Sequence, residues 1–258
     1  MTVDFVDGEP YWVDVSARDV PAAAQFYSRL FGWEAHDLGE ESGHYTMMSS
    51  QGREVCALGP CFGPDAVPAW TVYFQTSDPH ATTKAVETAG GTVRTPPMDV
   101  FDQTTLAQFT DTAGANFAVS QPKGHKGSQC WGEPVSVSWV ELHVPSAQSP
   151  LEFYKRVFGW SSRQMSMGEG GPEYTVLTAA GVDKSFGGLY SQLPAEAATV
   201  APHWLVYFEV PDADACAAKA ADLGGVVLAE PMTVPDIGRW AQVRDPEGAV
   251  FSVIASVH

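Results

Sequence analysis

The chain carries one sequence pattern twice, and this duplication constrains its fold more than any other feature. Trp12 and Trp139 begin the two copies, within the segments PYWVDVS and VSWVELH. In each copy, Phe-Tyr and then Phe-Gly-Trp follow, and all these matches are 127 positions apart. Further along, Trp-x-x-Tyr-Phe recurs at Trp70 and Trp204, which are 134 positions apart. Matches in the same order at nearly constant spacing predict two tandem copies of one domain.

The boundary between the copies lies in a segment rich in glycine and proline. We predict a first domain at 1–122, a linker at 123–134 and a second domain at 135–258. The linker is locally basic and has no hydrophobic periodicity, which is typical of a connecting segment. Whether the repeated units pair within each domain or exchange across the linker is left open by the sequence.

Each domain contains two similar units. In the first unit of the first domain, alternation of apolar and polar residues over 12–16 predicts a strand. Asp19 with Pro21 then predicts the start of a helix, and Gly32 predicts its end. Short strands are expected after the helix. In the second domain, Ser149 and Glu152 have the spacing of a capping box. The prediction is an α+β fold of four strand–helix–strands (βαβββ) units, two in each domain.

Charge and composition exclude several classes of function. The net charge is −17, with acidic and basic residues spread through both halves. This charge repels nucleic acid and anionic membranes, so we expect neither as a partner. No apolar run approaches the ~20 residues of a membrane span, and the N-terminal segment does not resemble a signal peptide. We therefore expect a cytoplasmic protein. The four cysteines lack the spacing of a metal site.

The order of these motifs resembles the vicinal-oxygen-chelate superfamily, which includes glyoxalase I, bleomycin-resistance proteins and extradiol dioxygenases. The resemblance covers nearly the whole chain as two tandem domains. It implies that each domain curls its strands into an open, cup-shaped sheet with helices outside and the ligand inside. The residues that carry it are Val13-Asp-Val, Phe26-Tyr27 and Phe31-Gly-Trp33 in the first copy, and Val140-Glu-Leu, Phe153-Tyr154, Phe158-Gly-Trp160 and Asp245-Pro-Glu-Gly248 in the second.

The resemblance also implies a divalent metal held by His, Gln or Glu, and here the sequence departs from the family pattern. The matching positions are Trp12, Thr71 and Ala118 in the first copy, and Trp139, Leu205 and Ser252 in the second. Indole and aliphatic groups offer no lone pair to a hard cation, and a lone hydroxyl is a poor ligand. We therefore expect no metal at the family's site, and no other cofactor.

Strand alternation predicts which side chains face each cup, because residues two apart share a face of the sheet. Tryptophan and tyrosine among a few polar groups favour a pocket for a planar, partly apolar ligand. The alternative is that Trp12 and Trp139 simply fill the cups as core. The predicted lining is Trp12, Asp14, Tyr73 and Gln108 in the first cup, and Trp139, Glu141, His143, His203, Tyr207, Glu209 and Gln242 in the second.

Asp14 and Glu141 are the sharpest polar signal, because a carboxylate occupies the same inward position in both copies. Burial would raise the pKa of each and suit a general base. The alternative is a hydrogen bond between strands without chemistry. His143 is a candidate proton shuttle and Tyr207 a candidate donor to a substrate oxygen.

Other histidines and one arginine leave further alternatives open. His143 and His203 with a carboxylate could form an unorthodox metal triad. Arg239 could clamp a ligand oxygen or bridge to an acidic neighbour. The remaining histidines fall in loops or at ends and are predicted to be solvated; they are His36, His44, His80, His125 and His258.

Three functions remain in competition. The first is a metal-independent enzyme of secondary metabolism that acts on an aromatic or polyketide-like molecule by proton transfer. Its reaction would be an isomerisation, elimination, rearrangement or assisted oxygenation. The second is a binding protein that sequesters a planar drug or metabolite, as bleomycin-resistance proteins do. The third is a glyoxalase-like detoxifier with an unorthodox metal. The expected partner is a small aromatic molecule, and the chain is expected to be a monomer or a homodimer.

Overall fold

The structure is a computed structural model that describes residues 3–63, 66–166 and 174–257. The first half of the chain contains β1 (Pro10–Ala17), α1 (Val20–Phe31), β2 (Glu34–Asp37), the short η1 (Glu40–Ser42), β3 (Thr46–Ser50), β4 (Arg53–Pro60), β5 (Trp70–Gln75), α2 (Pro79–Thr88), β6 (Thr92–Val100), β7 (Thr104–Thr110) and β8 (Asn116–Pro122).

The second half repeats the order of the strands and of the two longer helices, with the short helix α4 added and no counterpart of η1 among its described residues. It contains β9 (Val137–Val144), α3 (Gln148–Phe158), β10 (Ser161–Met165), β11 (Tyr174–Thr178), β12 (Ser185–Ser191), α4 (Pro194–Ala197), β13 (His203–Glu209), α5 (Ala213–Asp222), β14 (Val226–Val234), β15 (Gly238–Arg244) and β16 (Val250–Ser256).

The strands form two eight-stranded sheets with the same topology. The orders are β2-β3-β4-β1-β5-β8-β7-β6 and β10-β11-β12-β9-β13-β16-β15-β14. In each sheet the first strands of the two units, β1 with β5 and β9 with β13, pair antiparallel at the centre. The α+β prediction of four βαβββ units in two tandem cup-shaped sheets is confirmed. The units pair within each half of the chain, which answers the question that the sequence left open.

The helix boundaries follow local chemistry in most places. The Asp19 side chain accepts a hydrogen bond from the N–H of Ala22, and Gly32 ends α1 in the left-handed region at φ 78°. The predicted capping box in the second domain is wrong. Helix α3 already begins at Gln148, and Ser149 instead donates a hydrogen bond to the Thr112 hydroxyl across the domains.

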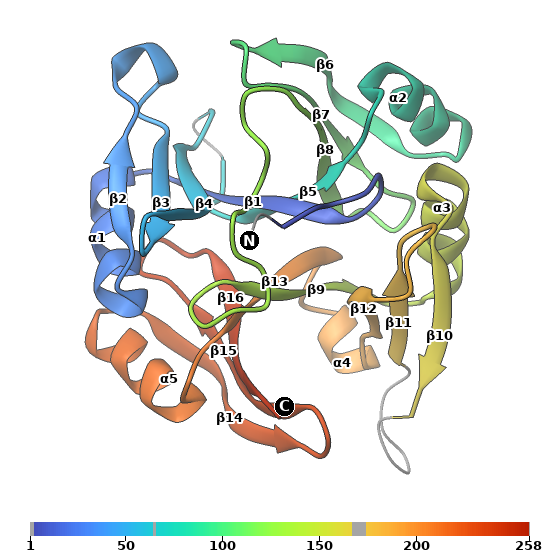
Figure 1. The fold of residues 1–258 in the computed structure, drawn as a ribbon. Helices are drawn as coiled ribbons and strands as arrows, with labels where there is room; N and C mark the ends of the chain where they lie inside the picture. Colours follow the sequence, from blue (N-terminus) through green and yellow to red (C-terminus); the bar gives the residue numbers. More distant parts are fainter. Residues whose placement is uncertain (1–2, 64–65, 167–173, 258) are drawn as a thin grey trace.

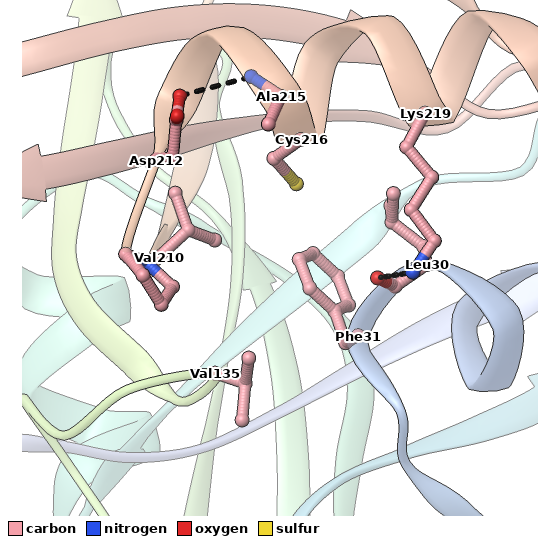
Figure 2. A pocket seen from close by; sticks show the side chains of 9 residues that line it. Leu30, Phe31, Val135, Val210, Asp212, Ala215, Cys216 and Lys219 are labelled. Carbon is pink, nitrogen blue, oxygen red and sulfur yellow. Dashed lines mark hydrogen bonds between the residues drawn. The ribbon is translucent and has the colours of Figure 1, made fainter.

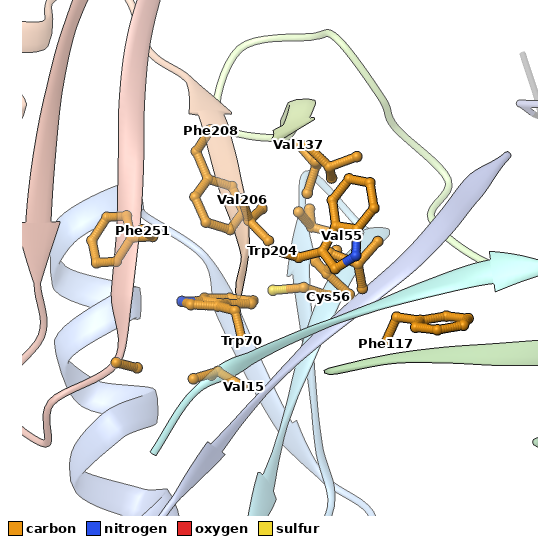
Figure 3. Packing of buried hydrophobic residues seen from close by; sticks show 14 of the residues in the cluster. Val15, Val55, Cys56, Trp70, Phe117, Val137, Trp204, Val206, Phe208 and Phe251 are labelled. Carbon is orange, nitrogen blue, oxygen red and sulfur yellow. The ribbon is translucent and has the colours of Figure 1, made fainter. Parts of the chain in front are cut away.

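The two sheets pack back to back around one shared hydrophobic core. In Figure 3, Phe208 and Phe251 of the second sheet lie close to Trp70 and Val15 of the first, and all four belong to a single buried cluster. Because the convex faces are buried against each other, the two concave faces turn away from each other (Figure 1). The protein therefore has two separate candidate ligand surfaces.

Paired hydrogen bonds lock the two halves together with approximate twofold symmetry. Tyr27 donates to Asp245 at 2.8 Å, and the equivalent Tyr154 donates to Asp111 at 3.0 Å. All four side chains are buried. Both aspartates also hold the turn before the last strand of their sheet by accepting three backbone N–H groups each. Helix α1 is thus bonded to the second domain through Tyr27, and α3 to the first through Tyr154.

None of the helices among the described residues has the length and apolar character needed to cross a membrane.

Candidate functional site

A partly buried hydrogen-bond network surrounds Asp14 on the concave face of the first sheet. Its Oδ2 accepts from the hydroxyls of Tyr73, at 2.9 Å, and Tyr45, at 3.0 Å. The Tyr45 hydroxyl in turn accepts from the indole N–H of Trp12 at 3.1 Å. The side chains come from strands β1 and β5 and from Tyr45, the residue just before β3, and sheet pairing brings these segments together.

The second sheet repeats this network around Glu141 and adds an imidazole. Glu141 Oε1 accepts from the Tyr207 hydroxyl at 2.9 Å and lies 2.7 Å from Nε2 of His143. A further hydrogen bond joins Glu141 to Tyr174, whose hydroxyl accepts from the indole N–H of Trp139 at 2.8 Å. Only 7% of Glu141 is exposed, so its charge depends on these partners rather than on water.

The two matched carboxylates have pKa values shifted in opposite directions. Burial raises the pKa of Asp14 to about 6, although hydrogen bonds from Tyr73 and Tyr45 oppose the shift. Burial is the largest single influence on Glu141 and acts to raise its pKa, but the hydrogen bond and charge of His143 together with the hydrogen bonds from Tyr174 and Tyr207 outweigh it and leave that pKa below its usual value. The expectation of a raised pKa at both positions is therefore wrong for Glu141. The residue two positions along is Ser16 in the first copy and His143 in the second.

Replacing Asp14 with asparagine is expected to stabilise the protein at alkaline pH. The pKa of Asp14 is higher folded than unfolded, so its ionisation costs stability above pH 6 and nothing below the unfolded value of about 4. We expect D14N to unfold with a free energy about 1–3 kcal/mol above that of the wild type at pH 8, a gap that closes as the pH falls. Urea unfolding at several pH values measures the gap.

The exposed Asp4→Asn is the control for the loss of one charge. If the free energies of unfolding of D14N and the wild type differed by the same amount at every pH from 8 to 4, the predicted ionisation of Asp14 would be contradicted.

Three aromatic rings occur beside Glu141 where the first sheet has small residues. The ring of His143 stacks on that of His203, with centroids 4.9 Å apart and planes at 28°, and lies 5.0 Å from the ring of Tyr190. At the aligned positions the first sheet has Ser16 in place of His143, Ala69 in place of His203 and Gly59 in place of Tyr190. The second concave face therefore has an additional aromatic wall.

The linker covers the first concave face. Drawn in light green in Figure 1, it runs from β8 between the two limbs of the first sheet towards β9. At one end, the N–H groups of Lys123 and His125 both donate to the carbonyl of Gln103. At the other, Ser128 N–H donates to the carbonyl of Tyr11 at 2.8 Å. Trp12 is only 5% exposed beneath this cover.

Glycine is required where the linker passes Tyr11. A Cβ at Gly127 would lie 2.3 Å from Cδ2 of Tyr11, and the backbone there has φ +88°. On the second face Trp139, the counterpart of Trp12, is partly exposed, and so are His143 and Trp240. The indole of Trp139 is therefore more exposed than that of Trp12.

The other predicted ligand-binding residues divide between the two faces and the outside. Gln108 accepts from Thr95 at 3.0 Å on the first sheet, and Gln242 lies on β15 in the second. Glu209 is buried, but its carboxylate accepts from the N–H and hydroxyl of Ser256, so it fastens the last strand.

The structure corrects the predictions for Arg239 and His125. Arg239 forms an ion pair with Asp214 of the outer helix α5 and hydrogen bonds to Thr233, so it bridges to an acidic neighbour outside the cup. His125, predicted to be solvated, is a partly buried ring packed on Trp12. His36, His44 and His80 are exposed as predicted, and His258 lies outside the described residues.

Sequence reasoning missed Tyr45, Tyr174 and Tyr190. The first two were visible as a repeat, because Tyr-Thr recurs at Tyr45 and Tyr174, 129 positions apart; Tyr45 directly precedes β3 and Tyr174 begins the matching β11. Tyr190 has no counterpart in the first copy and gave no such signal.

Two hollows lie away from the concave faces. One, of about 250 Å³, lies between α1 and α5 and is lined by apolar side chains such as Phe31 and Val210 (Figure 2). Its polar groups are engaged, since Lys219 donates to the carbonyl of Leu30 and Asp212 caps α5. The other, of about 440 Å³, lies beside the turn at Asp245–Gly248. Neither contains a cluster of groups suited to catalysis.

Paired βαβββ units that curve around an aromatic and acidic concave face define a class of proteins built from glyoxalase-like domains. The family model for the glyoxalase/bleomycin resistance protein/dioxygenase superfamily matches residues 11–119 and 136–253. The chain belongs to this superfamily.

Two relatives resemble the chain over nearly its whole length. It is 39% identical to the anthracycline biosynthesis protein DnrV of Streptomyces peucetius, covering 97% of this chain and 94% of that protein. It is 37% identical to the putative glyoxylase CFP32 of Mycobacterium tuberculosis, covering 97% and 96%.

Solved structures share the fold at low identity. One is the Mn(II)-bound glyoxalase of Novosphingobium aromaticivorans, with a TM-score of 0.66, 20% identity and coverage of 98% of this chain and 83% of that one. Another is the 2,3-dioxygenase LapB of Pseudomonas sp. KL28, with a TM-score of 0.66, 12% identity and coverage of 98% and 94%.

The side chains at the superfamily's metal positions do not fit a divalent cation. On the second sheet these positions hold the indole of Trp139, the buried aliphatic Leu205 and the hydroxyl of Ser252. Such groups are poor ligands for a hard cation. Among the described residues, no three His, Cys, Asp or Glu side chains come together in a way that could hold a metal. The triad of His143, His203 and a carboxylate is thus not assembled as a metal site.

Proposed function

We propose that the protein binds a planar aromatic, polyketide-like molecule on the second concave face and catalyses a metal-independent proton transfer there. The observation that carries this proposal is the buried Glu141–His143 pair beside partly exposed rings. The similarity to anthracycline biosynthesis proteins supports a fused-ring polyketide as the class of ligand. A net charge of −17 also favours a cationic ligand over an anionic one.

The geometry supports different roles for the two members of the pair. Glu141 is surrounded by donors and its pKa is lowered, so it is a weak base. It engages Nε2 of His143, which leaves Nδ1 as the ring nitrogen able to take a proton from a ligand. His143 is therefore the proposed proton acceptor, and Glu141 positions its ring and stabilises its protonated form. Tyr207 donates to Glu141 and fixes the carboxylate.

Binding can be tested with daunorubicin, a fluorescent, cationic anthracycline. We expect one bound molecule per chain and an affinity about 5- to 100-fold weaker in Trp139→Leu, because loss of a stacked ring costs about 1–3 kcal/mol. Fluorescence titration measures both quantities.

Trp12→Leu is the matched control on the covered first face and should bind as the wild type does, provided that circular dichroism shows it folded. If both variants bound daunorubicin equally weakly, or if Trp139→Leu bound it as tightly as the wild type, the ligand would not lie on Trp139.

The alternative is a binding protein that sequesters such a molecule without converting it. The aromatic wall of His143, His203 and Tyr190 supports this function equally well, because stacking needs no proton transfer. Binding of daunorubicin without any catalysed proton exchange would favour sequestration.

A further inference from the structure

An imidazole from the linker lies on the indole of the first concave face. The ring centroids of His125 and Trp12 are 4.3 Å apart, with planes at 76°, so one ring meets the other edge to face. The side chain of His125 is 16% exposed. In this position the ring lies above the network of Trp12, Tyr45 and Asp14.

Packing rather than hydrogen bonding holds this ring in place. Nε2 of His125 is buried and has no hydrogen-bond partner among the described residues. The nearest carboxylate oxygen, Oε2 of Glu54, is 3.7 Å away, which is too far for a hydrogen bond. Burial lowers the pKa of His125 to about 4, so the ring is neutral near neutral pH. It behaves as a neutral aromatic heterocycle seated on an indole.

We propose that the first concave face is an aromatic-ring site filled by the chain's own His125, and that a ligand's ring occupies the equivalent place over Trp139. The second part rests on the proposed function, whereas the first does not. The supporting symmetry is close, because each indole donates to a tyrosine hydroxyl that also bonds the matched acid.

The neighbours of Trp139 define the shape of the second ligand. His143, His203 and Tyr190 extend the aromatic surface at positions where the first face has Ser16, Ala69 and Gly59. A single imidazole fills the first site. The second suits a planar molecule of several fused rings, with one ring on Trp139 and the next towards His143.

Removing the internal ring tests the first part. We expect His125→Gly to melt at a lower temperature and to be stabilised by free imidazole in a saturable way. The recovery should be a few degrees, about 2–5 °C, at imidazole concentrations near ten times a dissociation constant on the order of 1–10 mM. The matched control is Lys126→Gly, at an exposed neighbouring position of the same linker. Imidazole should raise its melting temperature no more than it raises that of the wild type.

A second variant keeps the proposal testable if His125→Gly fails to fold. His125→Phe retains an aromatic ring and removes the unpartnered nitrogen, so its melting temperature should equal or exceed that of the wild type. His125→Ala should melt lower. A phenylalanine variant as unstable as the alanine variant, or no specific gain from imidazole in His125→Gly, would overturn the internal-ligand assignment.

Fluorine NMR with 5-fluorotryptophan reports on both faces at once. The resonances of Trp12 and Trp139, among eight tryptophans, are assigned by their loss in Trp12→Phe and Trp139→Phe. Imidazole should shift the Trp12 resonance in His125→Gly, and daunorubicin should shift that of Trp139 in the wild type.

The outcomes separate the two ideas. Daunorubicin that binds without moving the Trp139 resonance, or that moves the Trp12 resonance instead, would overturn the second part. Absence of any daunorubicin binding would count against the proposed function and this ligand placement, while the imidazole result still decides the first part.

Discussion

Replacing Glu141 with glutamine is expected to slow catalysed proton exchange about 100-fold or more while changing ligand affinity less than about threefold. The amide keeps the size of the carboxylate but removes the charge that stabilises a protonated His143. It can also present its N–H₂ to Nε2 and so favour the wrong ring tautomer. A lower exchange rate with unchanged affinity would show that Glu141 serves proton transfer and not only ligand binding.

The experiment measures deuterium uptake from D₂O into daunomycinone, an anthracycline aglycone with an enolisable acetyl group, by mass spectrometry. Asp14→Asn is the matched control, because it changes the equivalent acid beneath the linker and should leave the rate unchanged. Equal rates in the wild type and Glu141→Gln would refute the assigned role of Glu141. A wild-type rate no greater than that of buffer, with binding intact, would favour sequestration.

The fold was predictable because the sequence contains its evidence more than once. The repeat fixed the number of domains, and alternation along β1 and β9 placed Trp12, Asp14, Trp139 and Glu141 on the concave faces as the structure has them. Arg239 could have been placed by the same argument. It is three residues before Gln242, so an inward Gln242 puts Arg239 on the helix side.

Other parts of the site depend on contacts between distant segments, which local pattern does not record. Tyr45 and Tyr174 reach the acids across β4 and β12. His125 is buried only because the linker docks on the first sheet. The direction of the Glu141 pKa shift depends on a 2.7 Å contact that competes with burial, and only the assembled geometry decides which effect is larger.

The last prediction uses the first copy as a template for the second. His143→Ser installs the residue that the first copy has at this position, Ser16, and should make Glu141 behave like Asp14. Without the imidazole, burial dominates and the pKa of Glu141 should lie above its usual value rather than below it. Loss of a hydrogen-bond partner of the buried Glu141 carboxylate should destabilise the protein at pH 8 by about 2–4 kcal/mol.

The pH dependence should also change sign. In the wild type the lowered pKa of Glu141 contributes stability above the unfolded value of about 4.5, which is lost as pH falls through the folded pKa. In His143→Ser the raised pKa costs stability at high pH, and acidification towards pH 5 should relieve that cost. Urea unfolding at pH 8 and pH 5 gives both free energies.

Two further variants isolate the interaction. Exposed His80→Ser removes an imidazole without touching Glu141 and should leave the pH profile nearly unchanged. Adding Glu141→Gln to His143→Ser should restore much of the stability at pH 8, because the unpartnered charge is gone and a neutral amide can still accept from Tyr207. If the double variant were as unstable as the sum of the two single variants, His143 and Glu141 would not be energetically coupled, and the proposed proton-transfer pair would lose its physical basis.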